Sequence, residues 1–599
     1  MTEKYADYFM DVLKSNGYTH CFFIGGGNIL HLVEAARRRF TCVPVVHEVS
    51  ACIAAEYFNE VSDSSNERAF ALVTAGPGAT NCATGVAAAW LESRELLLVG
   101  GQARVDFISD GSVRQIGHQE INAIDMFRPV TKEAERFTTA RGRLEIEALL
   151  NASRTGRKGP VFIEICLDVS AYMVSPAELD AIENTTSQPA ASLPDLDIPQ
   201  MDTVISELRC SKRPVILLGG GVSRASMAVL LPLLRKLGIP VMTTWNGADR
   251  IGFDDDLHAG RPNTYGMRFS NLAIQQSDFV LAVGTRLGLQ QTGFAWEDFV
   301  PLGTLVQVDI DQAELDKGHP KVDIPVCADA TNFLNHLLSS TASEHAEQWH
   351  DWRTFVRSLR DLLPLCEEVN SASPGHIEAY RFVTELSGLT TGADQVIPCS
   401  SGGTFTIMMQ AFANVEGQVI ITDKGHASMG YGLAGAIGAA MRNPSRRTIL
   451  VEGDGGFAQN MQEVGTAVAQ KLNLKIFILD NDGYASIKTS LKSYFDGAYI
   501  GCDAASGLGL PDWLTFFSSF KIPTAVVSEA GFTPNVQALL AAPGAAAFVV
   551  KIDPEQQFFP KITSRMLTDG SMASNPLHRM TPSLPVQLEE RCLPWLLTK

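Results

Sequence analysis

Three segments of the chain share one pattern, and this repetition constrains the fold more than any other feature of the sequence. Each begins with an apolar run that ends in small residues: CFFIGGG (21–27), VILLGGG (215–221) and QVIPCSSGG (395–403). Each closes with a second apolar run followed by an acid: GPVFIEICLD (159–168), TLVQVDID (304–311) and AFVVKID (547–553). Between them, strand-like runs alternate with helical segments. This alternation predicts parallel sheets that helices cover on both faces.

The pattern therefore predicts an α/β protein with three doubly wound parallel-sheet domains. A length of 599 residues alone allows about three to five domains. Segments rich in Pro, Ser and acids, or with an amphipathic pattern, indicate linkers. The predicted parts are a first domain 1–174, a linker 175–200, a central domain 201–340, a linker helix 341–376, a third domain 377–555 and a C-terminal tail 556–599. The tail either covers a domain face or an active-site mouth, or is a flexible end.

Composition restricts the classes of partner. The formal net charge of −18 argues against a general nucleic-acid-binding surface. No stretch approaches the roughly 20 apolar residues of a membrane span, and the N-terminus lacks a signal-peptide core. The 11 cysteines form no CxxC pair and lie mostly in apolar runs, which is typical of reduced, buried thiols. We therefore expect a cytoplasmic enzyme that acts on small molecules and binds neither nucleic acid nor a membrane.

The sharpest motif is VEGDGGFAQNMQEVGTAVAQKLNLKIFILDNDGY (451–484). It predicts a strand, a tight glycine turn, a helix and a second strand. Asp454 and Asn481, 27 residues apart, both follow strand ends, and the carboxyl ends of parallel strands meet at one edge, where ligands bind. A carboxylate, an amide oxygen and the Gly483 carbonyl form a hard-oxygen set. This set suits Mg²⁺ or Ca²⁺, with phosphate and water in the remaining positions.

A second turn suits the same ligand. Gly402, Gly403 and Thr404 follow a predicted strand and open a predicted helix, about fifty residues before Asp454. Backbone N–H groups at a helix N-terminus attract a phosphate, and glycines let it approach. Such turns are frequent in proteins, so this turn predicts a phosphate site only in combination with the motif around Asp454.

The GDG…N pair is similar in residue types and spacing to the signature of thiamine diphosphate (ThDP) enzymes. The resemblance implies ThDP and Mg²⁺ as cofactors, with Asp454, Asn481 and Gly483 as metal ligands. The structural alternative, a glycine turn and an Asx turn at two strand ends, is what the GDG triplet alone would favour; the spacing and the second motif argue against it. The implied cofactor-binding residues in this half of the site are Gly402, Gly403, Thr404, Gly453, Asp454, Gly455, Gly456, Asn481, Gly483 and Tyr484.

The first domain offers the carboxyl that ThDP needs beside pyrimidine N1′. Glu48 lies at a predicted strand-to-helix junction, where a helix-start acid favoured by the dipole is the alternative. The pieces HEVSACIAAEYF, AGPGATN (75–81) and GHQE (117–120) resemble the pyrimidine-binding domain of the acetohydroxyacid synthase (acetolactate synthase) family. By that resemblance Glu48 is the N1′ partner, Gln119 faces the reacting centre, and the turn Gly76, Pro77 and Gly78 shapes the pyrimidine pocket.

The segment GHASMGYGL (425–433) resembles the family's cofactor-bending segment. The resemblance places Met429 under the bent cofactor and the Ala427 carbonyl at its 4′-amino group, and ordinary core packing of Met429 is compatible with that role. In this family the pyrimidine and diphosphate halves of a site come from different subunits. The resemblance therefore implies a homodimer or homotetramer with active sites at subunit interfaces.

The middle of the chain resembles the family's central domain, which holds FAD in acetohydroxyacid synthases. The matching pieces are RPVILLGGGVS (213–223), GIPVMTTWNG (238–247) and SDFVLAVGTRLG (277–288). Arg286 would suit dinucleotide phosphates, but no GxGxxG occurs, and glycine turns also appear in central domains that bind nothing. Bound FAD and an empty central domain both stay open, and FAD, if bound, would be structural.

The resemblance specifies ThDP chemistry more firmly than substrate. Leu167 stands where acetohydroxyacid synthases carry a lysine, Ser490 near their acceptor-selecting tryptophan, and His118 in place of a phenylalanine. The segment after the metal motif and the tail resemble instead carboligases of bacterial surface-sugar and secondary metabolism. We therefore expect a carboligase that takes a two-carbon acyl-anion equivalent from a 2-ketoacid, pyruvate, to an aldehyde or ketone acceptor such as a keto sugar.

Several alternatives stay open. His118 and Gln119 are candidates to steer protons and the acceptor, although His118 would equally suit a polar contact without a catalytic part. Within the class, the alternatives are an acetolactate synthase and a simple 2-ketoacid decarboxylase; the latter usually pairs two histidines, and no HH dipeptide occurs. Outside it, the alternative is a silent ThDP-fold regulatory subunit, which would not need Glu48, Asp454 and Asn481 intact.

Overall fold

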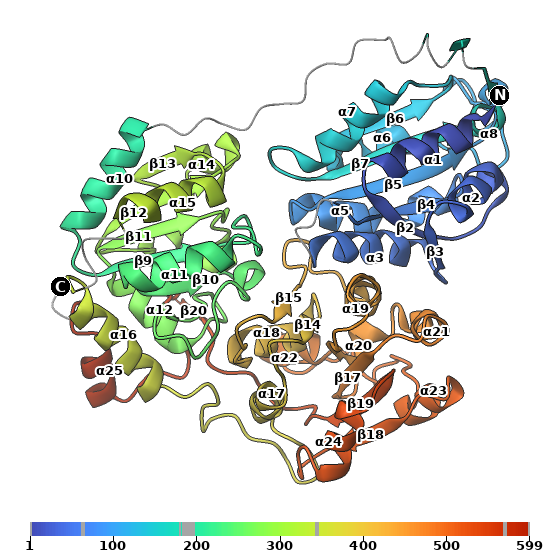
Figure 1. The fold of residues 1–599 in the computed structure, drawn as a ribbon. Coiled ribbons are helices and arrows are strands. Elements are labelled where there is room, and N and C mark those ends of the chain that lie inside the picture. Colours follow the sequence, from blue (N-terminus) through green and yellow to red (C-terminus); the bar gives the residue numbers. More distant parts are fainter. Residues whose placement is uncertain are drawn as a thin grey trace.

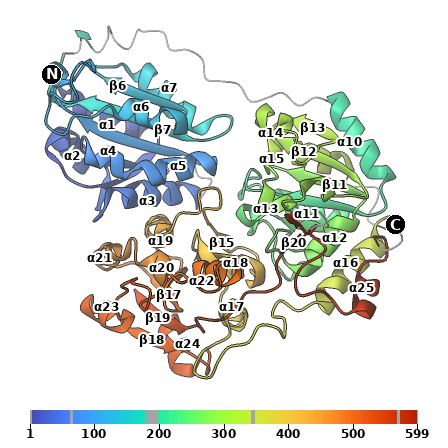
Figure 2. The same cartoon turned by 180° about the vertical axis from the view of Figure 1, so that it is seen from behind.

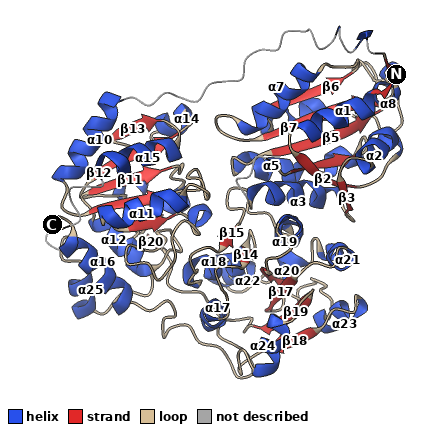
Figure 3. Ribbon diagram, viewed as in Figure 1, coloured by secondary structure: helices blue, strands red, loops and turns tan. Residues whose placement is uncertain are grey.

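The computed structural model describes residues 3–61, 66–175, 177–178, 181, 198–341, 347–566 and 572–596. They form three domains, each built on a parallel sheet, seen from two sides in Figures 1 and 2 and by element type in Figure 3. The predicted α/β class with three parallel-sheet domains is confirmed. Most of the predicted linker 175–200 lies outside the described residues. All eleven cysteines are free thiols.

The N-terminal sheet has six parallel strands in the order β3-β2-β4-β5-β7-β6. Every residue of β5 and β7 is buried, because helices cover both faces of the sheet and the strands are apolar except for Gln102 and Glu164. The strands are β2 (Tyr18–Phe23), β3 (Thr41–Pro44), β4 (Arg68–Val73), β5 (Leu96–Gln102), β6 (Glu133–Phe137) and β7 (Pro160–Cys166). The helices are α1 (Tyr5–Ser15), α2 (Leu30–Arg37), α3 (Glu48–Glu60), α4 (Pro77–Asn81), α5 (Ala83–Leu91), α6 (Ala123–Phe127), α7 (Arg143–Arg154) and α8 (Leu167–Ala171). A short ribbon, β1 (Glu3–Lys4) with β8 (Met173–Val174), joins the ends of this domain.

The central sheet has five parallel strands in the order β10-β9-β11-β12-β13. The strands are β9 (Pro214–Leu218), β10 (Val241–Thr243), β11 (Phe279–Val283), β12 (Thr304–Asp309) and β13 (Ile324–Cys327). The helices are α10 (Ile198–Cys210), α11 (Met227–Leu237), α12 (Arg268–Gln276), α13 (Leu289–Thr292), α14 (Gln312–Asp316), α15 (Ala330–Thr341) and α16 (His350–Leu362). Helix α16 turns Trp352, Val356 and Leu359 inward, a helical spacing that matches its amphipathic pattern.

The C-terminal sheet repeats the connectivity of the N-terminal one, with the order β15-β14-β16-β17-β19-β18. The strands are β14 (Gln395–Pro398), β15 (Val419–Ile420), β16 (Thr448–Gly453), β17 (Leu474–Asp480), β18 (Thr524–Val527) and β19 (Ala546–Lys551). The helices are α17 (Ala379–Gly388), α18 (Gly402–Ala411), α19 (Tyr431–Arg442), α20 (Asp454–Phe457), α21 (Val464–Ala469), α22 (Ala485–Tyr494), α23 (Trp513–Ser519) and α24 (Pro534–Ala541).

Helices α3 and α19 join the N- and C-terminal domains, and one apolar core continues across them. The small residues of α19 allow the close approach. A Cβ atom at Gly438 would lie 2.0 Å from the carbonyl oxygen of Ala54, and one at Gly435 would lie 2.7 Å from the ring of Tyr57. Ten residues of α3, from Val49 to Phe58, are buried, because α3 packs against its own sheet on one side and α19 on the other.

The described part of the tail returns to the central domain. Its hairpin, β20 (Ser564–Met566) and β21 (Met572–Ser574), is followed by α25 (Val586–Cys592), which lies beside α16 in Figure 1. The Gln276 side chain donates a hydrogen bond to Cys592 O at 2.9 Å, and the rings of Trp352 and Trp595 meet edge to face at 5.5 Å. These contacts attach the end of the chain to α12 and α16.

Candidate active site

The residues expected to bind a metal lie at the carboxyl edge of the C-terminal sheet. Strands β16 and β17 are neighbours, with Gly453 opposite Leu479, so Asp454 and Asn481 leave the sheet side by side. Asp454 Oδ2 accepts hydrogen bonds from the backbone N–H groups of Asn481 at 3.2 Å and Gly483 at 2.9 Å. Burial raises the pKa of Asp454 to about 7, against the lowering effect of these N–H groups.

Three oxygen atoms converge here when the Asn481 amide is suitably oriented. One terminal atom of that amide lies 3.3 Å from Asp454 Oδ1 and 3.1 Å from Gly483 O. A nitrogen at this point would donate to both acceptors, whereas an oxygen completes a triad of oxygens. Ligand oxygens around octahedral Mg²⁺ lie about 3 Å apart, so the triad fits that cation. Within the described part of the chain, no three His, Cys, Asp or Glu side chains gather as a metal-binding cluster.

The turn that is expected to bind phosphate contacts the same cluster. Gly402 begins α18 with a left-handed φ of +72°, which glycine adopts readily. A Cβ atom at Gly453 would lie 3.1 Å from Thr404 Oγ1, and one at Gly403 would lie 2.4 Å from the ring of Phe558. The ten-residue helix α18 directs its free N-terminal N–H groups toward this edge. The turn therefore fits a diphosphate beside the oxygen triad.

Gly455 makes room for a side chain at this edge, and Gly456 lies next to it. A Cβ atom at Gly455 would lie 2.4 Å from Cε1 of Tyr484, so the glycine allows the ring to lie against the GDG turn. A Cβ atom at Gly456 would lie 3.9 Å from Ser401 Oγ. The structure thus brings all the residues expected around the diphosphate and metal into one cluster.

Glu48 is the first residue of α3, just beyond strand β3, and its side chain is half-buried. Its Oε2 atom accepts a hydrogen bond from the Asn81 side chain at 3.0 Å, and Cys82 Sγ lies 3.6 Å from its backbone oxygen. The carboxylate is therefore oriented by the end of α4, the short helix that follows the AGPG turn.

The AGPG turn and the GHQE loop meet at the ends of β4 and β5. Gly76 has a φ of +61°, and a Cβ atom there would lie 2.5 Å from Gln119 O, so only glycine fits. Pro77 and Gly78 open α4. Gln119 has the left-handed φ of +61°, which is strained for a residue with a side chain. The buried Glu120 carboxylate pins this loop by accepting from the backbone N–H groups of Ser109 and Ile116 at 3.2 and 2.9 Å.

The three positions that depart from acetohydroxyacid synthases lie on separate elements. His118 has an exposed side chain in the loop that carries Gln119, and Ser490 is exposed on α22. Leu167 is the first residue of α8. The structure does not bring these three side chains into contact with one another.

Residues 423–430, called the bend segment below, include the Ala427 and Met429 expected at the cofactor, and they are held from several sides. Ala427 adopts a left-handed φ of +55°, a second strained residue at the site. The Ser400 hydroxyl, at the end of β14, donates a hydrogen bond to Ser428 O. Gln459 Nε2 lies 3.6 Å from the sulfur of Met429, whose side chain is 38% exposed. These contacts fix the Ala427 backbone and the exposed Met429 side chain at the surface of the C-terminal domain.

Within one chain the two halves of the site meet through Glu463. This buried carboxylate accepts hydrogen bonds from the backbone N–H groups of Val46 and His47, each at 3.0 Å, directly before Glu48. Among the described residues, no hydrogen bond or ion pair links Glu48 with the segment Asp423–Gly430. Within one chain the two domains are therefore joined close to Glu48, through Glu463, although Glu48 itself makes no such contact.

Sequence reasoning missed two residues that contact the segment around Glu48: Asn81 and Glu463. Asn81 and Glu463 lie inside motifs already singled out, AGPGATN and the stretch after GDGG. Their position inside these motifs was the one indication in the sequence. A single amide or carboxyl side chain forms no spacing pattern that would reveal its hydrogen-bond partner.

The central domain gives mixed evidence on FAD. A Cβ atom at Gly219 would lie 2.0 Å from Gly284 O, so packing between β9 and β11 already accounts for this glycine. Arg286 is exposed beyond β11. In contrast, Asn246 Oδ1 and Gln307 Oε1 are buried and find no hydrogen-bond partner among the residues that the structure describes, and such atoms would accept from a polar ligand. The residues fit a nucleotide only in part.

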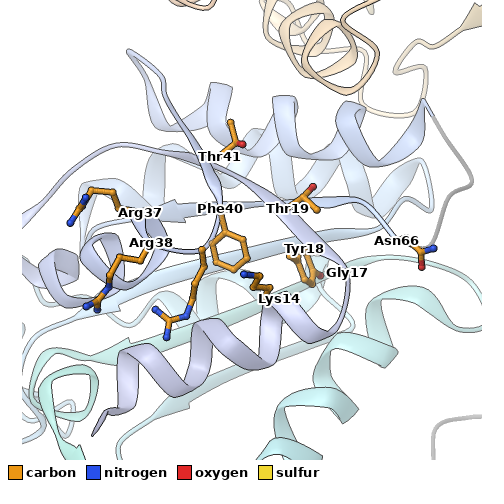
Figure 4. Close-up of a pocket in the computed structure, with 10 residues that line it drawn as sticks. Lys14, Gly17, Tyr18, Thr19, Arg37, Arg38, Phe40, Thr41 and Asn66 are labelled. Atoms are coloured by element: carbon orange, nitrogen blue, oxygen red, sulfur yellow. The ribbon is translucent and has the colours of Figure 1, made fainter.

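A separate polar pocket lies on the N-terminal domain, away from the predicted site (Figure 4). Its volume is about 480 Å³, and it contains none of the expected site residues. Ion pairs already engage its arginines, which contact Glu34, Asp7 and Asp11. Its lining residues are Lys14, Gly17, Tyr18, Thr19, Arg37, Arg38, Arg39, Phe40, Thr41 and Asn66.

Comparison with protein-family models gives three consecutive matches. The thiamine pyrophosphate enzyme N-terminal TPP binding domain matches residues 3–126, the central domain 201–337, and the C-terminal TPP binding domain 401–552. Each match falls on a different one of the three sheet domains. The fold and the site thus define a ThDP enzyme, a class also called thiamine pyrophosphate enzymes.

Comparison with curated proteins narrows the class. A probable acetolactate synthase large subunit of Methanocaldococcus jannaschii is 30% identical over 80% of both chains. A probable chloroplastic acetolactate synthase 2 of Oryza sativa is 28% identical over 96% of this chain and 87% of its own length. The isozyme 1 large subunit of Escherichia coli is 26% identical over 93% and 95%. The chain belongs to the acetolactate synthase family of ThDP-dependent enzymes.

No helix in the described part of the chain is both long and apolar enough to cross a membrane.

Proposed function

We propose that this enzyme decarboxylates a 2-ketoacid, with pyruvate as the donor, and transfers the remaining two-carbon unit to an aldehyde or ketone acceptor. The cofactors in this proposal are ThDP and Mg²⁺. When bound, ThDP would supply a nucleophilic carbon for attack on the ketoacid carbonyl and an acceptor for the electron pair released with CO₂. The convergence of Asp454, Asn481 and Gly483 oxygens supports a cation that holds the diphosphate.

The chain's own residues have distinct parts in this proposal. Glu48 holds a proton at pyrimidine N1′, and Asn81 keeps its carboxylate oriented. With ThDP bound, the Ala427 carbonyl would accept a hydrogen bond from the 4′-amino group, and Met429 would pack against the cofactor. Gln119 and His118, on the loop pinned by Glu120, are proposed to steer protons and the acceptor.

One observation carries the choice of acceptor: α22 presents Ser490, a small exposed residue, shortly after the metal cluster. By the resemblance, acetohydroxyacid synthases carry near this position the tryptophan that selects a 2-ketoacid acceptor. A serine leaves more room, and Ile487 and Tyr494 on the same helix are 50% and 73% exposed. This supports an acceptor larger than a 2-ketoacid, such as a keto sugar.

Formation of acetolactate, with a second ketoacid as acceptor, is the second candidate, which the names of the relatives favour. The deciding experiment incubates the enzyme, ThDP and Mg²⁺ with pyruvate, with and without carbonyl acceptors, and measures CO₂ and products. We expect a coupled product with aldehyde or keto-sugar acceptors. Acetolactate from pyruvate alone would overturn the choice of acceptor, and free acetaldehyde with every acceptor would identify a simple decarboxylase.

The same assay tests whether the chain is an enzyme or a silent regulatory subunit. Release of no CO₂ from any 2-ketoacid would overturn the catalytic proposal. In an active preparation, Glu48→Gln should abolish exchange of the C2 proton of bound ThDP while leaving the fold intact. Ser490→Trp should move product formation toward 2-ketoacid acceptors, with Ser493→Trp, also exposed on α22, as the matched control.

We propose further that the active unit is a homodimer or homotetramer whose sites lie between subunits. The support is that each half-site ends at an exposed rim: Val46 beside Glu48 is 57% exposed, and Met429 is 38% exposed. In this proposal the central domain has a structural role and no catalytic one, whether or not it binds FAD. Visible flavin absorption by the purified protein decides whether FAD is present.

A further inference from the structure

The segment Asp423–Gly430 presents two residues to the cofactor, yet its own backbone is unusual. Ala427 and Gly430 both have positive φ, +55° and +77°, and His426 and Ala427 are exposed. A strained, exposed segment keeps its conformation only if its surroundings fix it. Contacts from other domains fix the N-terminal end of this segment.

Glu92, at the C-terminal end of α5 in the N-terminal domain, supplies those contacts. Its Oε1 atom accepts hydrogen bonds from two successive backbone N–H groups, Lys424 at 2.5 Å and Gly425. Its Oε2 atom accepts from the side chain of Asn246 in the central domain. One carboxylate thus links all three domains, and a charged acceptor makes each of these hydrogen bonds stronger than a neutral one would.

The close approach depends on the sequence on both sides. A Cβ atom at Gly425 would lie 3.0 Å from Leu91 Cβ and 3.1 Å from Glu92 Oε1, so α5 packs tightly against the glycine. The Lys424 side chain extends the other way, with Nζ 4.7 Å from the ring centre of Trp245. The two residues that Glu92 holds are therefore confined from both directions.

A second contact lies directly beside the first. Arg94, two residues after Glu92, is buried and donates to Thr422 O at 2.6 Å and to Glu56 Oε1 at 2.8 Å. The Tyr431 hydroxyl donates to the other oxygen of Glu56. The turn after α5 thus holds the residues that precede the bend segment, while Tyr431 anchors the helix that follows it.

We propose that Glu92 is a positioning residue for the cofactor: by holding the Lys424 and Gly425 amides, it sets where the Ala427 carbonyl and Met429 lie. Glu92 does not touch the cofactor or the reacting atoms. The inference rests on the proposed function of the site, and it adds that the same subunit's N-terminal domain, through α5, orients the bend segment.

The test compares Glu92→Gln and Glu92→Ala with the full-length wild type. Three quantities are measured: ThDP affinity by fluorescence titration with Mg²⁺, the C2 proton exchange rate of bound ThDP, and the thermal midpoint of the cofactor-free protein. Losing a charged acceptor should weaken ThDP binding and slow exchange by roughly ten- to a hundredfold. The thermal midpoint of the Gln variant should stay close to that of the wild type.

Glu95→Gln is the matched control. Glu95 lies three residues away and pairs with Arg68 and Arg154, remote from the bend segment, so its removal should leave affinity and exchange unchanged. Unchanged ThDP affinity and exchange in Glu92→Gln would overturn the proposal, as would an equal loss in Glu95→Gln. If Glu92→Ala does not fold, the isosteric Gln variant decides.

Failure of the proposed function is a different result. A wild type that binds ThDP but forms no product from pyruvate and any acceptor would overturn the carboligase proposal. The affinity difference between wild type and Glu92→Gln would still decide the role of Glu92.

Discussion

Glu56 and Glu60 lie one turn apart on α3, yet their surroundings shift their pKa values in opposite directions. Complete burial raises the pKa of Glu56 to about 7, outweighing the opposing effect of Arg94. Burial also acts to raise the pKa of Glu60, but Arg224 and then Arg94 outweigh it and lower the value to about 2. The Arg224 guanidinium lies 2.9 Å from the Glu60 carboxylate. Two residues of one type thus respond oppositely to pH.

The sign of each response follows from proton linkage. Between pH 4.5 and about 7, folded Glu56 keeps a proton that the unfolded chain has lost. Its contribution to the free energy of unfolding is full below pH 4.5 and falls as the pH rises, by at most about 1.4 kcal/mol per pH unit. Glu56→Gln lacks this pH dependence. The free energy of unfolding of the variant, measured in urea, should therefore rise relative to that of the wild type between pH 5 and 7.

Glu60→Gln is the internal comparison. The contribution of Glu60 is present above pH 4.5 and lost as the pH falls toward 2, so this variant should differ from the wild type by a constant amount between pH 5 and 7. A difference between Glu56→Gln and the wild type that is equally flat across that range would contradict the prediction.

At the residue scale, much of the site was open to prediction from sequence. The spacing of Asp454 and Asn481 indicated two neighbouring strand ends, and β16 and β17 are neighbours. The partners of these residues were less accessible. Glu92 and Lys424 are 332 positions apart, and no local period or motif links a single glutamate to two backbone amides in another domain.

Among the elements, α3 and α19 show why small residues matter at a helix crossing. The sequence predicted α3 as a helix, but its buried residues lie all round it because two partners cover it. The glycines of α19 gave no sign of their partner in the sequence. Glycine is needed there because the backbone and side chains of α3 occupy the space that a Cβ atom on α19 would take.

Gly438→Ala should destabilise the protein. Alanine favours a helix by up to about 1 kcal/mol over glycine, but its Cβ would lie 2.0 Å from Ala54 O, and forcing α3 and α19 apart costs about 1–3 kcal/mol or more. The net effect in urea or thermal unfolding should therefore be a loss of stability, accompanied by weaker ThDP binding because both half-sites adjoin these helices.

The control for this prediction is Gly388→Ala. Gly388 ends α17, is exposed, and has no atom within 4 Å of an added Cβ, so alanine should leave stability unchanged or raise it by up to about 1 kcal/mol. If Gly438→Ala proved as stable as Gly388→Ala, the close approach of α3 and α19 would be wrong.

At the scale of the whole molecule, the two half-sites belong to different domains and open at exposed rims. If two subunits each contribute one half, damage to opposite halves should be complementary. Co-expression of Glu48→Gln and Asp454→Ala chains with different tags should yield a hybrid dimer with about half the wild-type activity, because one of its two sites keeps both intact halves.

Each homodimer of these variants should be inactive, which provides the baseline. A hybrid as inactive as its parents would show that each chain completes its own site, and the subunit-interface proposal would then fail.

The N- and C-terminal sheets share one strand order, and their functional segments follow corresponding strands. Counted along the chain, Glu48 and the bend segment follow the second strand of their sheets, β3 and β15. Gly76 and Asp454 follow the third strands, β4 and β16, and Gln119 and Asn481 follow the fourth, β5 and β17. The helices after the second strands, α3 and α19, are the ones that pack together. The two domains therefore meet through equivalent helices, and the residues expected at the cofactor come from equivalent loops. A ligand bound between such domains would meet two copies of one arrangement of loops, one at each of its ends.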